Sequence, residues 1–431
     1  MTDSTNDAVD ERTNLTDFES LGLSPRLLNT LRKQGLTTPT PIQTQAIPHV
    51  LDGRDLMGLA QTGTGKTAAF GLPLVHMQMK RGTRPEPKTA TTLILAPTRE
   101  LAKQIADNLR GFVMGSHLKI TMVVGGNSLN MQAKQLARGT DLLVATPGRL
   151  IDHLERRSLT LSETRYFVLD EADQMLDMGF IHALRQIAKL LPTERQTLLF
   201  SATMPKLMAE ISASYLNDPV RVEVAPPGKV ADKITQELHY VAQGDKGALL
   251  RKMLATHPEE RALVFMRTKH GAERLMRQLD RDGFAAGSIH GNKSQGQRDR
   301  ALKAFRDGSS KVLVATDVAA RGIDIPGVRH VYNFDLPNVP ENYVHRIGRT
   351  ARAGADGTAY AFCAEAEMSM LWDIEKVMGF AIPPVSGTAW AAAPVKGRRG
   401  GGGNGARPPK PGAKPRGRSS RRRSGGGRKA A

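Results

Sequence analysis

A short glycine-rich segment has the residue types needed to bind phosphate. Residues 60–67 read Ala-Gln-Thr-Gly-Thr-Gly-Lys-Thr and follow an apolar segment at 55–59. A glycine-rich turn between a strand and a helix directs several backbone N–H groups at one point, and the helix dipole adds positive charge there. Lys66 offers a full charge to the outer phosphates of a nucleotide, and Thr67 offers a hydroxyl to a magnesium ion. Because Ala60 stands where the strict pattern has glycine, an ordinary turn with a surface lysine stays open at this point.

Two adjacent carboxylates farther along the chain fit the hydrolysis of a nucleotide. Asp170 and Glu171 directly follow the apolar segment 166–169. One carboxylate at such a position can hold magnesium, and its neighbour can orient or deprotonate the attacking water. An Asp-Glu pair can also be a plain polar exit from a strand. The phosphate-loop pattern upstream and Asp173 two residues later favour the catalytic interpretation.

A pair of arginines in the second half of the chain could complete such a site. Arg349 and Arg352 are three residues apart, so we expect them to share one face of a helix. Basic residues on a solvated helix are common and indicate little by themselves. The second half has no glycine–lysine phosphate loop of its own, however. An arginine donated across a cleft can stabilise a transferring phosphoryl group, an effect of about 10³–10⁵ in rate.

Alternating apolar segments predict the scaffold that positions these residues. Continuous apolar runs followed by polar or turn-forming residues are typical of strands covered on both faces of a parallel sheet. Ligands bind at the carboxyl ends of such strands. The expected strands are 55–59, 92–96, 120–124, 141–145, 166–169 and 196–200, then 261–265, 286–289, 311–315, 328–333 and 359–362. The pattern predicts an α/β protein with two parallel-sheet domains of similar size.

Charge and composition set the limits of these domains. The predicted organisation is a disordered N-terminus at 1–16, a first domain at 17–222, a linker at 223–232, a second domain at 233–385 and a disordered basic tail at 386–431. Residues 396–431 contain 13 Lys or Arg and no Asp or Glu, and removing them from the net charge of +19 leaves +6 for residues 1–395. Charge this concentrated attracts polyanions without reading their sequence. We expect the tail to tether structured RNA.

The remaining composition excludes several classes of protein. The single cysteine, Cys363, allows neither a disulfide within the chain nor a cysteine-based metal site. The polar, acidic start lacks the order of a signal peptide. No apolar run approaches the roughly 20 residues of a membrane span. We therefore expect a cytoplasmic protein.

The residues together resemble the DEAD-box ATP-dependent RNA helicases of the bacterial type. The resemblance covers about residues 18–380 and includes motifs beyond those above. These motifs are Phe18 with Pro39-Thr40-Pro41-Ile42-Gln43, Pro97-Thr98-Arg99-Glu100-Leu101, Gly125-Gly126, Thr146-Pro147-Gly148-Arg149, Asp170-Glu171-Ala172-Asp173, Ser201-Ala202-Thr203, Gln295-x-x-Arg298, Ala315-Thr316-Asp317 with Ala320-Arg321-Gly322-Ile323-Asp324, and His345-Arg346-Ile347-Gly348-Arg349-Thr350-Ala351-Arg352. Ala60 is usual in this family. The resemblance implies two tandem RecA-like domains and hydrolysis of ATP with Mg²⁺.

The resemblance also implies roles for the nucleotide-site residues. Glu171 would be the general base, Lys66 would act on the phosphates, and Arg349 and Arg352 would be arginine fingers. Thr67 and Asp170 would hold magnesium. Nucleotide binding would use Phe18, Gln43, Thr62, Gly63, Thr64, Gly65, Lys66, Thr67 and Asp324, with Gln43 recognising adenine. Leu36 departs from the family, because many members have an aromatic residue there against the adenine.

A second set of implied roles concerns RNA and the coupling of the two domains. The residues expected to hold the RNA backbone are Arg99, Gly126, Thr146, Arg149, Arg267, Thr316 and Arg321. Those expected to link the domains are Asp173, Ser201, Thr203 and His345. Contacts to phosphates and 2′-hydroxyls would favour RNA without reading its bases. An ATP-timed RNA clamp or annealing chaperone and a DNA-directed motor remain as alternatives.

Overall fold

The computed structural model describes residues 17–60, 63–204, 206–224, 234–320, 325, 327–351 and 356–390. We refer to residues 17–224 as lobe 1 and to residues 234–390 as lobe 2. The predictions for residues 1–16, for most of the linker and for the chain beyond Trp390 lie outside the described residues. Four predicted site residues lie outside them too: Thr62, Arg321, Asp324 and Arg352.

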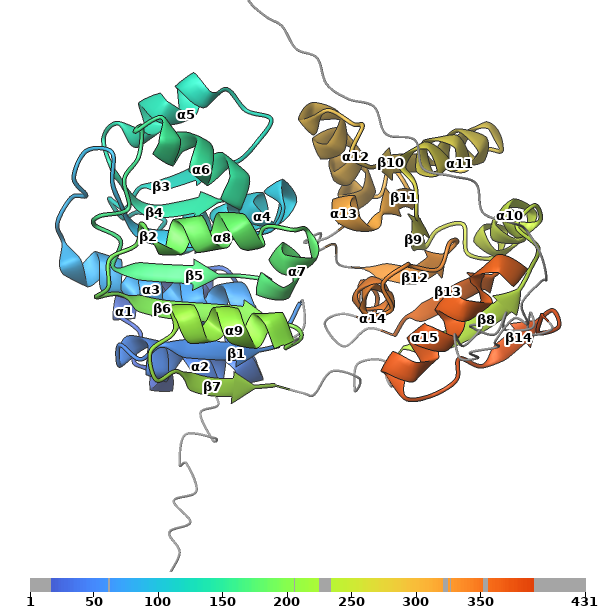
Figure 1. Ribbon diagram of the computed structural model, residues 1–431, viewed down its shortest axis with the longest axis horizontal. Coiled ribbons are helices and arrows are strands. Elements are labelled where there is room, and N and C mark those ends of the chain that lie inside the picture. Colours follow the sequence, from blue (N-terminus) through green and yellow to red (C-terminus); the bar gives the residue numbers. More distant parts are fainter. Residues whose placement is uncertain are drawn as a thin grey trace, which may run out of the picture. The chain divides into compact units, whose positions relative to one another are not determined.

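Lobe 1 contains a seven-stranded sheet in which every neighbouring pair is parallel (Figure 1). Its strand order is β3-β4-β2-β5-β6-β1-β7. The strands are β1 Leu56–Leu59, β2 Ala90–Leu95, β3 Ile120–Val123, β4 Thr140–Ala145, β5 Tyr166–Leu169, β6 Gln196–Ser201 and β7 Val220–Glu223. The helices are α1 Pro25–Lys33, α2 Pro41–Leu51, α3 Lys66–Arg81, α4 Arg99–Phe112, α5 Leu129–Leu136, α6 Pro147–Glu155, α7 Ala172–Asp177, α8 Ile181–Ala188 and α9 Lys206–Tyr215, after a 3-10 turn at Glu19–Leu21.

Lobe 2 repeats this architecture with a second parallel seven-stranded sheet, in the order β10-β11-β9-β12-β13-β8-β14. The strands are β8 Thr235–Tyr240, β9 Arg261–Met266, β10 Ala286–Ile289, β11 Val312–Thr316, β12 Val328–Asn333, β13 Thr358–Cys363 and β14 Pro384–Ser386. The helices are α10 Lys246–Thr256, α11 Lys269–Arg281, α12 Gln295–Asp307, α13 Asp317–Ala320, α14 Glu341–Ile347 and α15 Met368–Met378, with a 3-10 turn at Glu365–Glu367. The two sheets confirm the predicted α/β architecture.

Each sheet is covered on both faces, which explains the continuous apolar strands. Side chains alternate between the two faces of a strand. In β5, Val168 belongs to one apolar cluster of lobe 1, whereas Phe167 and Leu169 belong to the other. In β9, Leu263 and Val264 divide in the same way between the two clusters of lobe 2. Burial on both faces therefore replaces the polar–apolar alternation of a half-exposed sheet.

Three strands were not predicted from the sequence, and their positions explain why. Strands β7 and β14 are sheet edges, and β8 lies next to β14. Every residue of β14 is exposed, and β7 buries one residue in four. Strand β7 ends one residue beyond the predicted domain limit of 222. Lobe 2 also extends past 385, because the Trp390 Nε1 donates a hydrogen bond to the Cys363 carbonyl at 3.0 Å, so the predicted start of the tail at 386 is corrected.

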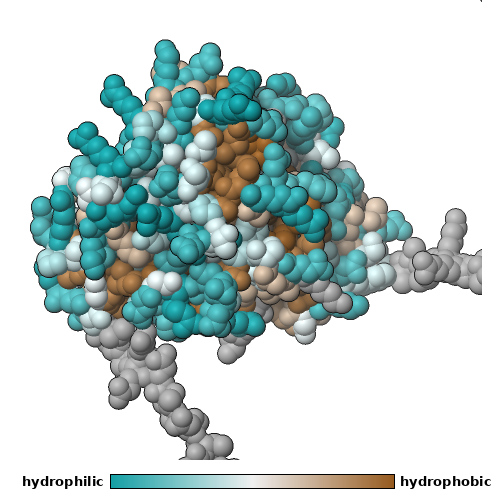
Figure 2. Space-filling view, turned by 60° about the vertical axis from the view of Figure 1, so that its left-hand side comes forward, coloured by the Kyte–Doolittle hydropathy of each residue, from teal (hydrophilic) through white to brown (hydrophobic). Residues whose placement is uncertain are grey.

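On the face that Figure 2 shows, the surface of the described residues is mainly hydrophilic, with apolar areas between polar side chains. Exposed large apolar side chains occur in both lobes, for example Met114, Met131 and Trp372. Such scattered exposure is normal for a folded protein. Among the helices of the described residues, none combines the length and the apolar character that a membrane span requires. Cys363 is a free, buried cysteine.

Candidate active site

The strand order of lobe 1 brings the predicted catalytic segments to one edge of the sheet. Strand β6 pairs with β5 on one side and with β1 on the other. The glycine-rich loop follows β1, the carboxylates follow β5, and Ser201 ends β6. All three strands are parallel, so their carboxyl ends meet. This is the edge at which ligands bind in open α/β sheets.

The last glycine of the phosphate-loop segment, Gly65, could not be replaced by another residue without strain. Gly65 caps α3 with φ of 92°, a left-handed conformation that glycine adopts readily. A Cβ atom at this position would also collide with the side-chain amide nitrogen of Gln43. Gln43 donates from Nε2 to the Gly65 carbonyl at 3.1 Å and accepts from the Thr40 backbone N–H at 3.0 Å. Gln43 therefore links the start of α2 to the loop.

Lys66 begins α3 and is buried at the base of the loop. Its side chain is directed back over the loop, because Nζ donates to the Ala60 carbonyl at 2.9 Å. The ammonium group also lowers the pKa of both Asp170 and Glu171, opposing the effect of their burial. A lysine in this position faces the same small volume as the helix N-terminus, where an anion is most stable.

The two carboxylates differ in conformation and in hydrogen bonding. Asp170 accepts the Glu171 N–H at 3.0 Å, whereas the buried Oε2 of Glu171 has no hydrogen-bond partner among the described residues. Glu171 has φ of 52° and ψ of 51°, a left-handed conformation that is uncommon for residues other than glycine. This conformation turns the chain from β5 into α7.

Burial sets the protonation behaviour of both carboxyl groups. It raises the pKa of Asp170, against the positive charge of Lys66. Burial, opposed by Lys66 and supported by the charge of Asp170, raises the pKa of Glu171 to about 7. A carboxylate whose pKa lies near neutrality is a stronger base than an exposed one, and it is suited to take a proton from water. Its unpartnered Oε2 is the atom available for that contact.

A cavity of about 460 Å³ connects these groups, and its size is within the range of small-molecule sites. The predicted residues that line it are Gln43, Gly63, Gly65, Lys66, Thr67, Asp170, Glu171 and Arg349. Leu36 lines it as well and is 42% exposed. Gln104 and Asn108 of α4 add polar groups that the sequence did not reveal. Phe18 is instead buried in the core of lobe 1.

Asp173 connects the exits of two strands within lobe 1. Its Oδ2 accepts from the Thr203 backbone N–H and from the Thr203 hydroxyl, both at 2.9 Å, and from the Ala202 N–H at 3.2 Å. Ser201 donates from its hydroxyl to the Thr203 carbonyl at 2.7 Å. The structure thus joins three of the four residues predicted to couple the domains. His345, the fourth, lies on α14 of lobe 2.

The prediction that Arg349 lies on a helix is wrong. Helix α14 ends at Ile347 with Gly348 as its C-cap, and Ala351 has a positive φ of 53°. The segment therefore turns out of the helix before Arg349. Arg349 is buried, and its Nε donates to the His345 carbonyl at 3.2 Å. Its guanidinium group lines the cavity and is among the charges that lower the pKa of Glu171.

A neighbouring arginine has a structural role that the sequence did not reveal. Arg346 is almost fully buried and lies over the ring of Phe265 at 4.9 Å. It forms a two-pronged ion pair with Asp317, at 2.5 and 2.8 Å, and donates to the Asp335 carbonyl at 2.6 Å. Such planar, bidentate pairing is specific to arginine. The sequence contains an Asp-containing motif at 315–317 and an Arg-rich motif at 345–352. Their spacing alone cannot show which of the arginines pairs with Asp317.

Four of the predicted RNA-binding residues lie together on lobe 1. Arg99, Gly126, Thr146 and Arg149 line a second cavity of about 340 Å³, together with Arg298. Thr98 and Thr146 are the N-caps of α4 and α6, so two helix N-termini begin at this cavity. Helix N-termini and arginines are typical ligands of nucleic-acid phosphates.

Gly126 allows the side chain of Arg99 to lie directly against the backbone of the second cavity. It has φ of 85°, and a Cβ atom there would collide with the guanidinium of Arg99. Arg149 donates from Nη1 to the Asn127 carbonyl at 2.8 Å and to Gln132 Oε1 at 3.0 Å. Glu100, for which the sequence predicted no role, forms an ion pair with Arg298 at 2.9 Å.

The two described candidates of lobe 2 have a different environment. Thr316 ends β11 and is buried. Arg267 follows β9, and its Nη2 pairs with Glu367 at 3.1 Å. Glu367 is itself buried and also pairs with Lys246 at 2.5 Å. Part of the positive charge of Arg267 is therefore neutralised inside lobe 2.

Comparisons with known proteins identify the family of the chain. The sequence pattern of the DEAD/DEAH box helicase family matches residues 40–211, and that of the helicase conserved C-terminal domain matches residues 245–354. The chain is 42% identical to the ATP-dependent RNA helicase CshA of Listeria monocytogenes over 87% of this chain and 71% of that protein. It is 44% identical to the DEAD-box ATP-dependent RNA helicase CshA of Bacillus subtilis over 83% of this chain and 72% of that protein.

A solved structure extends the agreement to the fold. Saccharomyces cerevisiae Dbp5 bound to RNA and ADP BeF3 matches with a TM-score of 0.77 and 31% identity, covering 86% of this chain and 96% of that chain. The match includes both lobes and confirms the predicted tandem RecA-like domains. With both family patterns matched and a relative 42% identical over most of the chain, the chain belongs to the DEAD/DEAH box helicase family.

Proposed function

We propose that this chain is an ATP-dependent RNA helicase whose ATPase centre is the 460 Å³ cavity at the carboxyl edge of the lobe 1 sheet. One observation carries the proposal: the phosphate loop, the buried Asp170–Glu171 pair and Arg349 all line this cavity. RNA is the nucleic-acid partner, in line with the RNA bound to the similar Dbp5. The RNA backbone binds at the second cavity, where Arg99, Arg149 and two helix N-termini meet.

The residues of the first cavity have separate tasks in hydrolysis. The N–H groups at the start of α3 and the ammonium of Lys66 hold the β- and γ-phosphates of ATP. Glu171 accepts a proton from the attacking water at its unpartnered Oε2. Arg349 stabilises the charge of the transferring phosphoryl group. Gln43 recognises the adenine of ATP. Its amide also donates a hydrogen bond to the Gly65 carbonyl, which connects the adenine contact to the phosphate loop.

The donor set also fits a magnesium ion. Thr67 offers a hydroxyl and Asp170 offers a buried carboxylate oxygen, and both line the cavity. Hard oxygen donors of this kind, one or two from the protein and the rest from phosphates and water, are the usual environment of Mg²⁺. A bound magnesium ion would neutralise charge on the β- and γ-phosphates.

Strand-displacement assays test the proposed activity. The full chain is mixed with an all-RNA duplex or an all-DNA duplex of equal length and composition, with or without ATP. We expect separation of the RNA duplex only with ATP. Tight RNA binding without strand separation would favour an ATP-timed clamp or annealing chaperone. Efficient separation of the all-DNA duplex would instead favour a DNA-directed motor.

Replacing Lys66 with alanine is expected to weaken ATP binding by roughly 10-fold to 100-fold, because a charge-assisted hydrogen bond contributes about 1.5–3 kcal/mol. A fluorescent ATP analogue titrated into the protein measures the affinity. Lys80→Ala is the matched control, since Lys80 lies on the same helix, outside the cavity, and its replacement removes the same charge. Equal ATP affinities of the Lys66→Ala variant and the unmodified protein would contradict the assignment.

A cytoplasmic location is part of the proposal. It is supported by the similarity to bacterial RNA helicases and by the basic composition of the tail, which suits a polyanionic partner. Fractionation of the source cells with an antibody to the chain would test it.

A further inference from the structure

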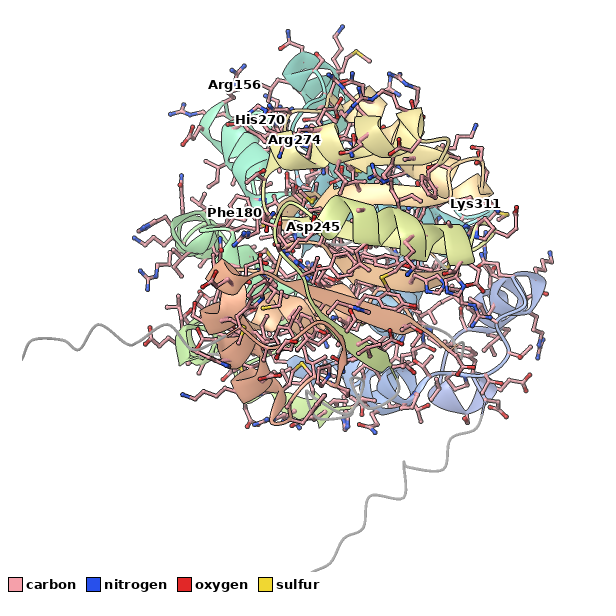
Figure 3. All side chains as sticks on the ribbon, turned by 90° about the vertical axis from the view of Figure 1, so that its right-hand side faces the viewer. Arg156, Phe180, Asp245, His270, Arg274 and Lys311 are labelled. Atoms are coloured by element: carbon pink, nitrogen blue, oxygen red, sulfur yellow. The ribbon has the colours of Figure 1, made fainter. Side chains whose placement is uncertain are left out.

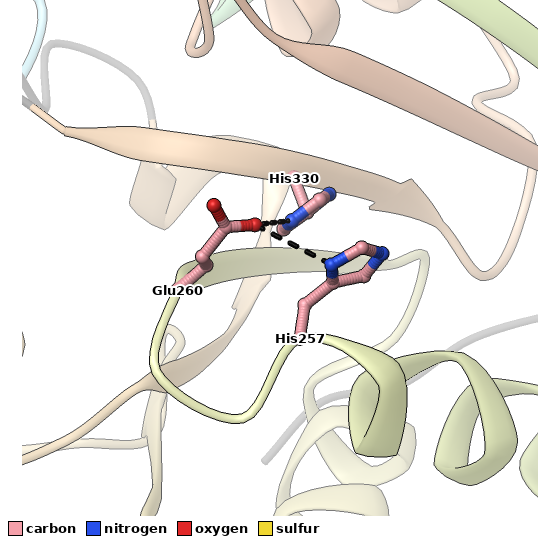
Figure 4. Close-up of side chains that lie close together, drawn as sticks. All are labelled: His257, Glu260 and His330. Atoms are coloured by element: carbon pink, nitrogen blue, oxygen red, sulfur yellow. Dashed lines mark hydrogen bonds and ion pairs between the residues drawn. The ribbon is translucent and has the colours of Figure 1, made fainter.

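A group of three potential metal ligands lies at the amino edge of the lobe 2 sheet, away from the strand ends that carry the candidate active site. His257 and Glu260 lie in the connection between α10 and β9, and His330 is in β12. Figure 4 shows their side chains converging. Their ligand atoms all lie within 4.8 Å of one another.

The three side chains lie close enough together to share one ion. Glu260 Oε2 is 2.5 Å from His330 Nε2 and 3.5 Å from His257 Nδ1. The two imidazole rings stack with centroids 4.3 Å apart. Zinc–ligand bonds of about 2.0–2.1 Å in a tetrahedron place the ligand atoms roughly 3.3 Å apart. To reach that arrangement, the carboxylate of Glu260, which is 44% exposed, and the exposed ring of His257, which stacks on His330, would both have to turn.

A further contact supports the orientation of the buried imidazole. His330 Nδ1 lies 3.4 Å from the hydroxyl of Tyr360, on the ring edge opposite Nε2. Metal-binding histidines commonly have such a hydrogen-bond partner on the second ring nitrogen, which fixes the tautomer and the ring plane. Tyr360 thus leaves Nε2 directed at the point between the three side chains.

A neutral imidazole and an ionised carboxylate are the forms that bind metals. Two cations lie nearby. Arg329 donates to the Asp356 carbonyl at 2.9 Å, and Lys311 pairs with the adjacent Glu259 at 3.3 Å, so both have partners of their own.

We propose that His257, Glu260 and His330 bind one zinc ion, with water completing the coordination. Two imidazoles and one carboxylate are a ligand set that zinc adopts when one position stays open. His257 is 41% exposed, so the outer side of the site is accessible to water. The ion would fasten the α10–β9 connection to β12, with the effect of stabilising lobe 2 rather than taking part in ATP hydrolysis.

Cobalt binding to the nucleotide-free full chain tests the site. Tetrahedral Co²⁺ has strong visible absorption, whereas aqueous Co²⁺ has almost none, and Zn²⁺ should displace it. We expect one equivalent of absorbing Co²⁺, and a loss of affinity of roughly tenfold or more in His257→Ala and in Glu260→Gln. His270→Ala is the matched control, because His270 is exposed at the start of α11, which follows the carboxyl end of β9 and not its amino end (Figure 3).

A second measurement separates metal binding from a change in folding. Zn²⁺ should raise the Tm of the unmodified protein and of His270→Ala, and leave the Tm of both ligand variants unchanged, while the RNA-stimulated ATPase rate stays the same in all four. Absence of tetrahedral Co²⁺ absorption in the unmodified protein would overturn the proposal. Equal Co²⁺ affinity in His257→Ala, Glu260→Gln and His270→Ala would also overturn it.

Discussion

Glu171→Gln is expected to lower the RNA-stimulated rate of ATP hydrolysis by about 10²–10⁴-fold. Glutamine has nearly the same shape as glutamate, so the left-handed turn between β5 and α7 should persist. The amide of glutamine cannot accept the proton of the attacking water, however. The Oε2 atom of Glu171, which has no hydrogen-bond partner among the described residues, is the atom available for that proton. Single-turnover hydrolysis of radiolabelled ATP with saturating RNA measures the chemical step.

ATP binding separates this effect from damage to the site. The variant should bind a fluorescent ATP analogue with nearly unchanged affinity, because Lys66 and the loop remain intact. Glu155→Gln, an exposed position on α6, makes the same change of charge on the same lobe and should leave hydrolysis unaltered. Turnover of Glu171→Gln within about threefold of the unmodified rate would rule out Glu171 as the base, since a general base contributes at least about 10²-fold.

The sequence predicted the centre of this site because its chemistry depends on local patterns. A glycine–lysine loop after an apolar segment, and Asp170–Glu171 after another, identify two strand ends. Because β6 is parallel to both β1 and β5 and lies between them, the two strand ends lie at the same edge of the sheet. Neither the left-handed conformation of Glu171 nor the raised pKa of its carboxyl group could be predicted, because both depend on packing around the turn.

The parts that the sequence did not predict depend on partners far apart in the chain. Arg346 and Arg349 belong to one Arg-rich motif, yet the first is buried against Asp317 and the second lines the cavity. Spacing cannot distinguish them, because the helix ends between them at Ile347. The edge strands were missed for a related reason: an exposed strand such as β14 carries no continuous apolar run.

The separation of these two arginines leads to a further expected result. Arg349→Ala should lower RNA-stimulated hydrolysis by about 10³–10⁵-fold, the contribution of an arginine that stabilises phosphoryl charge. Arg349→Lys keeps the charge but not the planar fork of donors, so it should recover only part of the rate. ATP affinity should change little in either variant, because Lys66 and the helix N-terminus hold the phosphates.

Arg346→Ala provides the contrast that makes this result specific. Removing one partner of a buried ion pair costs about 3–5 kcal/mol, since Asp317 would keep a charge with no partner for it. This variant should therefore lose thermal stability, measured as a fall in Tm, whereas Arg349→Ala, which breaks no buried ion pair with Asp317, should lower the Tm less. If Arg349→Ala instead lost as much stability as Arg346→Ala and retained its rate per folded molecule, its guanidinium would be structural.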